Sequence, residues 1–158
     1  GGTNELAVKG CEEILIEEDK TFDIICCPVG TGGTISGLIN ASEPYQKILG
    51  FPALKGDFLQ KEIGKFTAKS NWELVTDYHF GGYAKINSTL VEFINRFKQE
   101  YNIPLDPIYT GKMMLAIYNL IEKKYFESNT NVVALHTGGL QGIARFNALH
   151  GNLIKYQQ

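Results

Sequence analysis

The sequence predicts a three-layer α/β domain in which helices cover both faces of a mostly parallel sheet. Two observations carry this prediction. Apolar runs of strand length alternate along the chain with apolar residues at helical spacing, and two of those runs end in glycine-containing turns that lead into helices. A chain of 158 residues can bury one sizeable core. Residues 1–158 are therefore expected to form a single domain.

The individual elements follow from local patterns. Strands are expected where short apolar runs are bounded by turn residues, at 23–29, 47–51, 72–76 and 131–135. Helices are expected where apolar residues recur every three or four positions, from 4 to 15 with Asn4 as a cap, from 35, at 57–66, from 88 through 97, at 109–121 and through 143–146. Strands that alternate with helices in this way favour parallel pairing.

Charge and cysteine content narrow the class of protein. A formal charge of -2 and a pI near 5.9 provide no basic field for nucleic acid. The apolar stretches are far shorter than the ~20 residues that cross a bilayer, so we expect a soluble, cytoplasmic protein. Cys26 and Cys27 are neighbours on a strand and should leave opposite faces, and Cys11 lies at helical spacing with apolar residues. We expect packing roles for these thiols, and neither a disulfide nor a metal site.

The most informative stretch runs from Asp23 to Gly37 and reads as a buried strand, a tight Gly/Thr turn and the start of a helix. Glycines allow the backbone N–H groups of such a turn to point inward together, where the helix dipole and threonine hydroxyls favour an anion. A phosphate group is the natural ligand. A turn with a purely structural role is the alternative, because glycines also serve steric needs.

Two better-known phosphate loops do not match this stretch. The dinucleotide fingerprint requires a third glycine where Ile35 stands, and Gly50 occupies the region where an acidic residue would bind a ribose. The Walker loop requires a lysine after its last glycine, whereas Gly37 is followed by Leu38. The phosphate is therefore expected to belong to another kind of cofactor.

Ligands of open α/β sheets bind beyond the carboxyl ends of the strands. Four segments should meet there, namely 31–34, 81–83, 109–110 and 137–139. They bring hydroxyls, phenols and backbone donors, with no obvious carboxylate base. Simpler interpretations remain open, since a tyrosine in a glycine loop often only packs and His136, at the end of a strand, is often a hydrogen-bonded core histidine.

Four motifs together carry a resemblance to a known family. Gly1-Gly2-Thr3-Asn4, Gly30-Thr31-Gly32-Gly33-Thr34, the stretch from Asp106 to Lys112, and His136-Thr137-Gly138-Gly139 occur in this order along the whole chain. The chain resembles the 1-aminocyclopropane-1-carboxylate deaminase and D-cysteine desulfhydrase family. That resemblance implies a pyridoxal 5'-phosphate enzyme of fold type II, of which residues 1–158 form most of the large cofactor domain. It implies that the N-terminal half, with the small domain and the Schiff-base lysine, is absent.

The resemblance also implies roles for individual residues. The cofactor phosphate would be held by Thr31, Gly32, Gly33 and Thr34. The two active-site tyrosines would be Tyr83 and Tyr109, while Thr137 and Gly138 would lie beside the cofactor. Thr110 matches the position facing the pyridine nitrogen, where the deaminase branch has a glutamate and the desulfhydrase branch a small hydroxyl residue. Lys112 is expected to be a solvated residue in the first turn of a helix.

The implied function is the deamination of small amino acids by a homodimeric parent enzyme, with D-cysteine desulfhydrase or 1-aminocyclopropane-1-carboxylate deaminase activity. The chain alone is expected to lack turnover. A non-catalytic α/β module that binds a phosphate or a nucleotide is the alternative, and a Schiff-base lysine in the preceding sequence would decide between the two.

Overall fold

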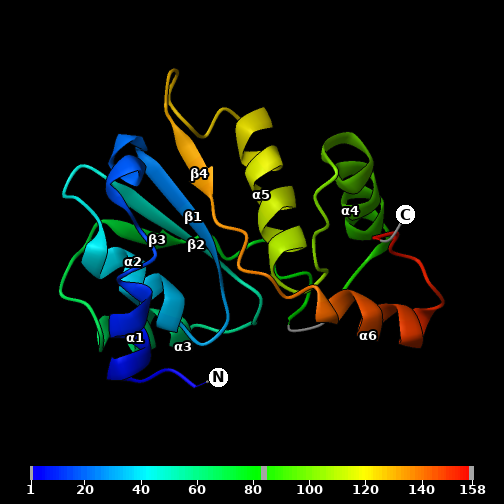
Figure 1. Ribbon diagram of the computed structural model, residues 1–158, viewed down its shortest axis with the longest axis horizontal. Helices are drawn as coiled ribbons and strands as arrows, with labels where there is room; N and C mark the ends of the chain where they lie inside the picture. Colours follow the sequence, from blue (N-terminus) through cyan, green and yellow to red (C-terminus); the bar gives the residue numbers. More distant parts are fainter. Residues whose placement is uncertain (1, 83–84, 157–158) are drawn as a thin grey trace.

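The computed structural model describes residues 2–82 and 85–156. Its described strands form one four-stranded sheet in the order β3-β2-β1-β4, in which every pair is parallel (Figure 1). The strands are β1 (Ile24–Val29), β2 (Lys47–Pro52), β3 (Trp72–Leu74) and β4 (Val132–Ala134). The helices are α1 (Glu5–Cys11), α2 (Gly33–Ala41), α3 (Phe58–Gly64), α4 (Ser88–Tyr101), α5 (Thr110–Glu122) and α6 (Gln141–His150), with a 3-10 helix, η1 (Glu17–Thr21), between α1 and β1.

β1 lies at the centre of the sheet because its neighbours approach from both sides. Ile25 is opposite Ile48 of β2 and Val133 of β4. Since all strands run in the same direction, their carboxyl ends meet at one edge of the sheet, which is where ligands of such sheets bind. The parallel sheet predicted from the sequence is confirmed.

One face of the sheet is covered by α1, α2 and α3 (Figure 1). Its core joins Ile25, Cys27 and Val29 of β1 to apolar residues of α2 and α3. Cys26 points to the opposite face and packs with Met113 of α5 in a separate cluster, so the predicted division of the two thiols is confirmed. Burial raises the pKa of Cys26 to about 12 and that of Cys27 further still, which makes both thiols packing groups.

The other face is covered by α5, and this completes the predicted three layers. Met113, Ala116 and Ile117 of α5 pack on the sheet, whereas Leu115 turns away from it toward α4 and α6. α4 and α6 lie beyond α5 (Figure 1), which explains why most of α5 is buried.

α1 crosses α2 at very short range. A β-carbon on Gly37 would lie 2.4 Å from Cβ of Cys11, so only glycine permits this approach. Asn4 caps α1 through a 2.8 Å hydrogen bond from the Ala7 N–H, as predicted. The predicted extension of this helix to Leu15 is wrong, because the last turn closes with bonds of the 3-10 type and α1 ends at Cys11.

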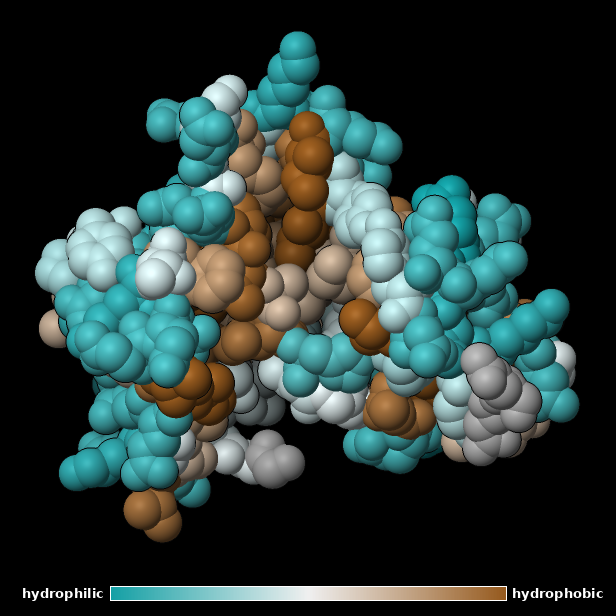
Figure 2. Space-filling model, turned by 45° about the horizontal axis from the view of Figure 1, so that its top comes forward, coloured by the Kyte–Doolittle hydropathy of each residue, from teal (hydrophilic) through white to brown (hydrophobic). Residues whose placement is uncertain are grey.

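Apolar side chains are exposed in a hollow between more polar flanks (Figure 2). β4 is a three-residue edge strand, and each of its residues is only half-buried. Its outer edge pairs with no strand in the described residues.

No helix among the residues described is both long and apolar enough to cross a membrane.

Candidate functional site

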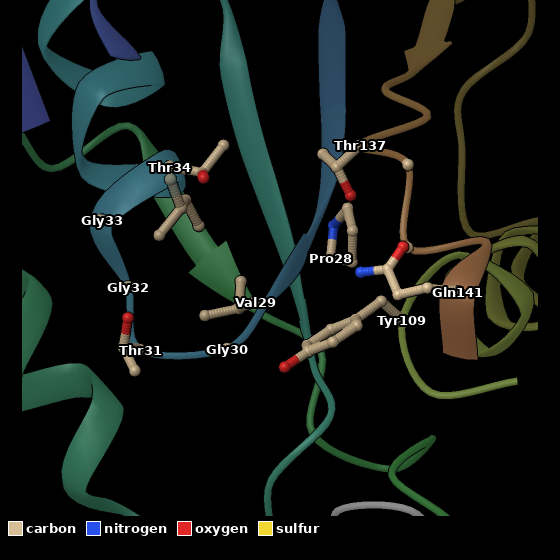
Figure 3. A pocket seen from close by; sticks show the side chains of 13 residues that line it. Pro28, Val29, Gly30, Thr31, Gly32, Gly33, Thr34, Tyr109, Thr137 and Gln141 are labelled. Carbon is tan, nitrogen blue, oxygen red and sulfur yellow. The ribbon is translucent and has the colours of Figure 1, made fainter. Parts of the chain in front are cut away.

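A cavity of about 400 Å³ opens at the carboxyl edge of the sheet (Figure 3). Three loops that are far apart in the sequence form its walls, and the fold brings them together at this edge. The described residues that line it are Pro28, Val29, Gly30, Thr31, Gly32, Gly33, Thr34, Ile35, Tyr109, Thr137, Gly138, Gly139 and Gln141.

The first wall is the turn between β1 and α2, which leaves the N-terminus of α2 open. Gly32 is the N-cap residue and has a φ of 98°, a left-handed conformation that glycine adopts without strain. It provides no side-chain cap. Within residues 2–82 and 85–156, no acceptor pairs with the N–H groups of Gly33, Thr34 or Ile35. These unpaired donors and the positive end of the helix dipole favour an anion.

A threonine from the start of the chain supports this turn. The Thr3 hydroxyl donates to the Thr31 hydroxyl over 2.6 Å, and a β-carbon on Gly33 would lie only 3.2 Å from Oγ1 of Thr3. The short α1–α2 crossing thus brings the beginning of the chain against the loop. Sequence reasoning did not assign Thr3 to the site, because its partner is 28 residues away.

The second wall is Tyr109, which lies just before α5. Its ring approaches Gly30 so closely that a β-carbon there would be 3.4 Å from the ring and from the phenol oxygen. The adjacent turn is built by Asp106, a carboxylate that is only 1% exposed. That carboxylate accepts from the N–H groups of Ile108 (2.8 Å), Tyr109 (2.9 Å) and Thr110 (2.8 Å). The backbone that carries Tyr109 is therefore rigidly held.

The third wall is the turn after β4. Its Thr137 faces the cavity together with Gln141 from the first turn of α6 (Figure 3). His136 fixes the turn, since its Nδ1 accepts from the Gly138 N–H over 3.2 Å and its Nε2 lies 2.8 Å from the Pro104 carbonyl. Both ring nitrogens of His136 are bonded, as the simpler interpretation expected, but the residue is exposed and does not belong to the core. The sequence analysis did not predict Gln141, because no motif around it indicates that its side chain lines the cavity.

The structure thus brings together Thr31, Gly32, Gly33 and Thr34 with Tyr109, Thr137 and Gly138. Of the segment 81–83, Gly81 and Gly82 are not among the described lining residues. Tyr83 lies outside the described residues.

Thr110 does not line the cavity, which departs from the expectation that it faces the pyridine nitrogen. It is fully buried, and its hydroxyl donates to the Asp106 carboxylate over 2.7 Å. The hydroxyl oxygen of Thr110 also accepts a hydrogen bond from the Asp106 N–H over 3.0 Å. Because the single hydroxyl proton is already used, Thr110 has none to offer a ring nitrogen in this arrangement.

Lys112 also corrects a sequence prediction. Far from being solvated, it is only 2% exposed, and its ammonium group donates to the carbonyls of His79 (2.9 Å) and Gly82 (3.0 Å). Burial lowers its pKa to about 8, and the Asp106 carboxylate opposes that shift. It does not line the cavity, whose described lining contains no lysine.

The cavity suits a phosphorylated cofactor such as pyridoxal 5'-phosphate. Unpaired N–H groups on α2 and the hydroxyls of Thr31 and Thr34 provide donors for a phosphate, and the described lining carries no carboxylate that would repel it. The volume lies within the range of ordinary ligand pockets. Fold and cavity together define an α/β domain with a candidate anion site at the start of a helix, at the carboxyl edge of a parallel sheet.

No protein family model matches the chain. Individual proteins do match it. A protein of Thermotoga maritima, provisionally named 1-aminocyclopropane-1-carboxylate deaminase, is 32% identical over 90% of this chain and 51% of its own length. The Arabidopsis thaliana protein named bifunctional D-cysteine desulfhydrase/1-aminocyclopropane-1-carboxylate deaminase, mitochondrial, is 29% identical over 90% of this chain and 41% of its own.

Solved structures agree with these relatives. A crystal structure described as an ACC deaminase homologue superposes with a TM-score of 0.72 at 26% identity, covering 94% of this chain and 49% of that one. The processed form of threonine deaminase isoform 2 from Solanum lycopersicum shares the fold, with a TM-score of 0.56 at 18% identity, over 91% of this chain and 50% of that one. The resemblance and the fold expected from the four motifs are confirmed. The chain spans about half the length of the relatives it matches.

Proposed function

We propose that this chain is the cofactor-binding part of a pyridoxal-phosphate-dependent enzyme that deaminates small amino acids. The observation that carries the proposal is the open N-terminus of α2, where three N–H groups and two threonine hydroxyls face a cavity at the carboxyl edge of the sheet. The names of the relatives support the cofactor and the reaction class. The length that the relatives have beyond this chain would provide the small domain and the lysine that holds the cofactor.

In this proposal the residues of the chain bind and orient. Bound pyridoxal phosphate supplies the electron sink for bonds broken at the substrate's α-carbon. The turn from Thr31 to Thr34 holds its phosphate, and Thr137 and Gly138 limit the cavity on the opposite side. We assign to Tyr109, which is carried by a rigid turn, the role of holding or moving a proton near the reacting carbons, and we assign the same role to Tyr83.

We also propose that a β-substituted amino acid such as D-cysteine is a better substrate than 1-aminocyclopropane-1-carboxylate. No carboxylate lines the described cavity. The nearby Asp106 carboxylate is hydrogen-bonded to backbone N–H groups at the start of α5. A nearby carboxylate would favour a protonated pyridine ring and so a stronger electron sink. Opening an unactivated cyclopropane ring depends on that sink more than expelling a thiol does. The ratio of kcat/KM for the two substrates in the full-length protein tests this, and a preference for ring opening would refute it.

The binding site itself is tested by Thr34→Val in the full-length protein. Loss of one hydroxyl donor should weaken pyridoxal-phosphate binding by about 1 to 3 kcal/mol. Thr89→Val is the matched control, because Thr89 occupies the same position in the first turn of α4. Equal affinities for the two variants would remove Thr34 from the site. Binding of inorganic phosphate without preference for the cofactor, and without turnover, would favour a non-catalytic phosphate-binding module.

Two further properties are proposed on the same basis. The full-length protein is expected to form a homodimer, which size-exclusion chromatography with light scattering would test. A cytoplasmic location agrees with three cysteines that form no disulfide.

A further inference from the structure

The segment from His79 to Gly82 follows an unusual backbone path. Phe80 has a φ of 56°, in the left-handed region that a bulky residue rarely adopts. Gly81 (φ 98°) and Gly82 (φ 125°) continue the turn. A strained conformation of this kind persists only when surrounding contacts determine it.

Contacts within the turn are short-range. The Gly81 N–H donates to Nδ1 of His79 over 2.9 Å, and the Gly82 N–H donates to the His79 carbonyl over 3.1 Å. Two contacts come from outside the turn. Phe80 packs against the apolar cluster of α4, α5 and α6, and the ammonium group of Lys112 reaches the carbonyls at both ends of the turn from 33 and 30 residues away. Lys112 therefore joins the turn to α5.

The identity of this side chain is informative. Burying an ammonium group costs free energy, and an apolar side chain of similar length would fill the space without that cost. The fall in the pKa of Lys112 to about 8 reflects the burial, and Asp106 is the carboxylate that offsets part of it. A buried charge that donates to two carbonyls of one strained turn suits a positional role better than a role in general stability.

We propose that Lys112 is a positioning residue, which fixes the turn 79–82 relative to the start of α5, where Tyr109 borders the cavity. Tyr83 is the next residue after Gly82, and Lys112 lies in the first turn of the helix that Tyr109 precedes. The inference rests on the proposed function, in which both tyrosines act on one substrate. It adds the residue that joins the turn 79–82, which directly precedes Tyr83 in the sequence, to the helix that follows Tyr109.

The test compares Lys112→Met with Lys123→Met in the full-length protein. Both remove one positive charge, but Lys123 is an exposed residue at the end of α5. Hydrogen exchange is measured on peptides that cover 79–82 and 30–36, together with pyridoxal-phosphate affinity, KM and kcat. Lys112→Met should speed exchange in 79–82 only, leave cofactor affinity within about twofold, and lower kcat about 10- to 100-fold, since small misplacements of reacting groups are costly.

Other outcomes have clear meanings. If Lys112→Met loosens 79–82 while kcat stays within about twofold of the control, or if exchange rises equally in 30–36, the positioning role is refuted. If Lys112→Met does not fold, Lys112→Arg keeps a donor, and a loosened turn with unchanged kcat again refutes the role. A wild-type protein that binds no pyridoxal phosphate would refute the proposed function instead, while the exchange comparison would still report on the contact between Lys112 and the turn.

Discussion

Two helices, α2 and α5, begin at the same edge of the sheet, yet their N-termini are satisfied in opposite ways. At α2 the capping position is Gly32, and the N–H groups of the first turn meet no acceptor in the described part of the chain. At α5 the Asp106 carboxylate accepts from three consecutive N–H groups and from the Thr110 hydroxyl. The N-terminus of α2 is left open to an external anion, and we call α2 the open helix. The N-terminus of α5 is satisfied by the Asp106 carboxylate, and we call α5 the closed helix.

The comparison explains why the candidate anion site lies at the start of α2 and not at the start of α5. A carboxylate in the first turn satisfies the donors and neutralises the dipole, so the start of α5 has little attraction left for a ligand. The rigid start of α5 instead fixes the backbone of Tyr109, on one side, and of Lys112, on the other. The start of α2 is therefore free to bind an anion, whereas the start of α5 holds its neighbouring side chains in place.

Removing the internal anion should have the largest effect. Asp106→Ala leaves the N–H groups of Ile108, Tyr109 and the buried Thr110, together with the Thr110 hydroxyl, without their acceptor. We therefore expect the free energy of unfolding to fall by about 3 to 5 kcal/mol. Urea denaturation measures this. Asp57→Ala is the matched control, because Asp57 occupies the N-cap position of α3 without a side-chain cap bond and should change stability by less than about 0.5 kcal/mol. Similar losses in both variants would contradict the special role of Asp106.

Converting the open helix into the closed kind should separate binding from stability. Thr34→Asp places a carboxylate in the first turn of α2, which should leave stability unchanged or raise it by about 0.3 to 1 kcal/mol. The same charge should repel a phosphate and weaken cofactor binding about 100-fold, or about 2.7 kcal/mol. Thr89→Asp at the equivalent position of α4 controls for the added charge. Undiminished affinity in Thr34→Asp would place the phosphate elsewhere.

A smaller effect concerns pH and the cation beside the closed helix. The pKa of Lys112 is about 8 in the folded protein and about 10.5 when unperturbed. Between these values the unfolded chain binds more protons, so stability should rise with pH, with a slope of at most about 1.4 kcal/mol per pH unit. Below pH 8 the full cost of the buried charge remains. Denaturation of wild type and Lys112→Met between pH 7.5 and about 10 measures the difference, and parallel curves would contradict it.

The open helix was predictable from sequence and the closed one only in part. The strand, glycine turn and helix start from Ile24 to Ala41 are encoded in consecutive residues, so local patterns reveal them. The burial of Lys112 depends instead on carbonyls 30 and 33 residues away, which no periodicity reports. The Thr110 hydroxyl, which the resemblance places beside a cofactor, donates to the Asp106 carboxylate four residues earlier, and the motif does not reveal this bond.

The predicted end of the first helix was wrong for a local reason. The apolar residues Ile14 and Leu15 continue the spacing of α1, but the helix ends at Cys11 as the chain turns toward η1. Thr3 and Gln141 carry no motif of their own, and only the fold brings them to the cavity or its turn. The sequence thus predicted the elements and residues on all three walls of the cavity, whereas the contribution of Thr3 and Gln141 depends on how the fold brings segments together.

The close crossing at Gly37 ties ligand binding to the local order of α1. α1 is a seven-residue helix that rests on α2 where Gly37 has no side chain, and the same packing presents Thr3 to Thr31. A helix this short has little stability of its own. Any ligand that favours the arrangement with α1 docked must, by thermodynamic linkage, reduce local unfolding of α1 by the same free energy. Hydrogen exchange in α1 would therefore report the binding of such a ligand in a cavity that α1 itself does not line.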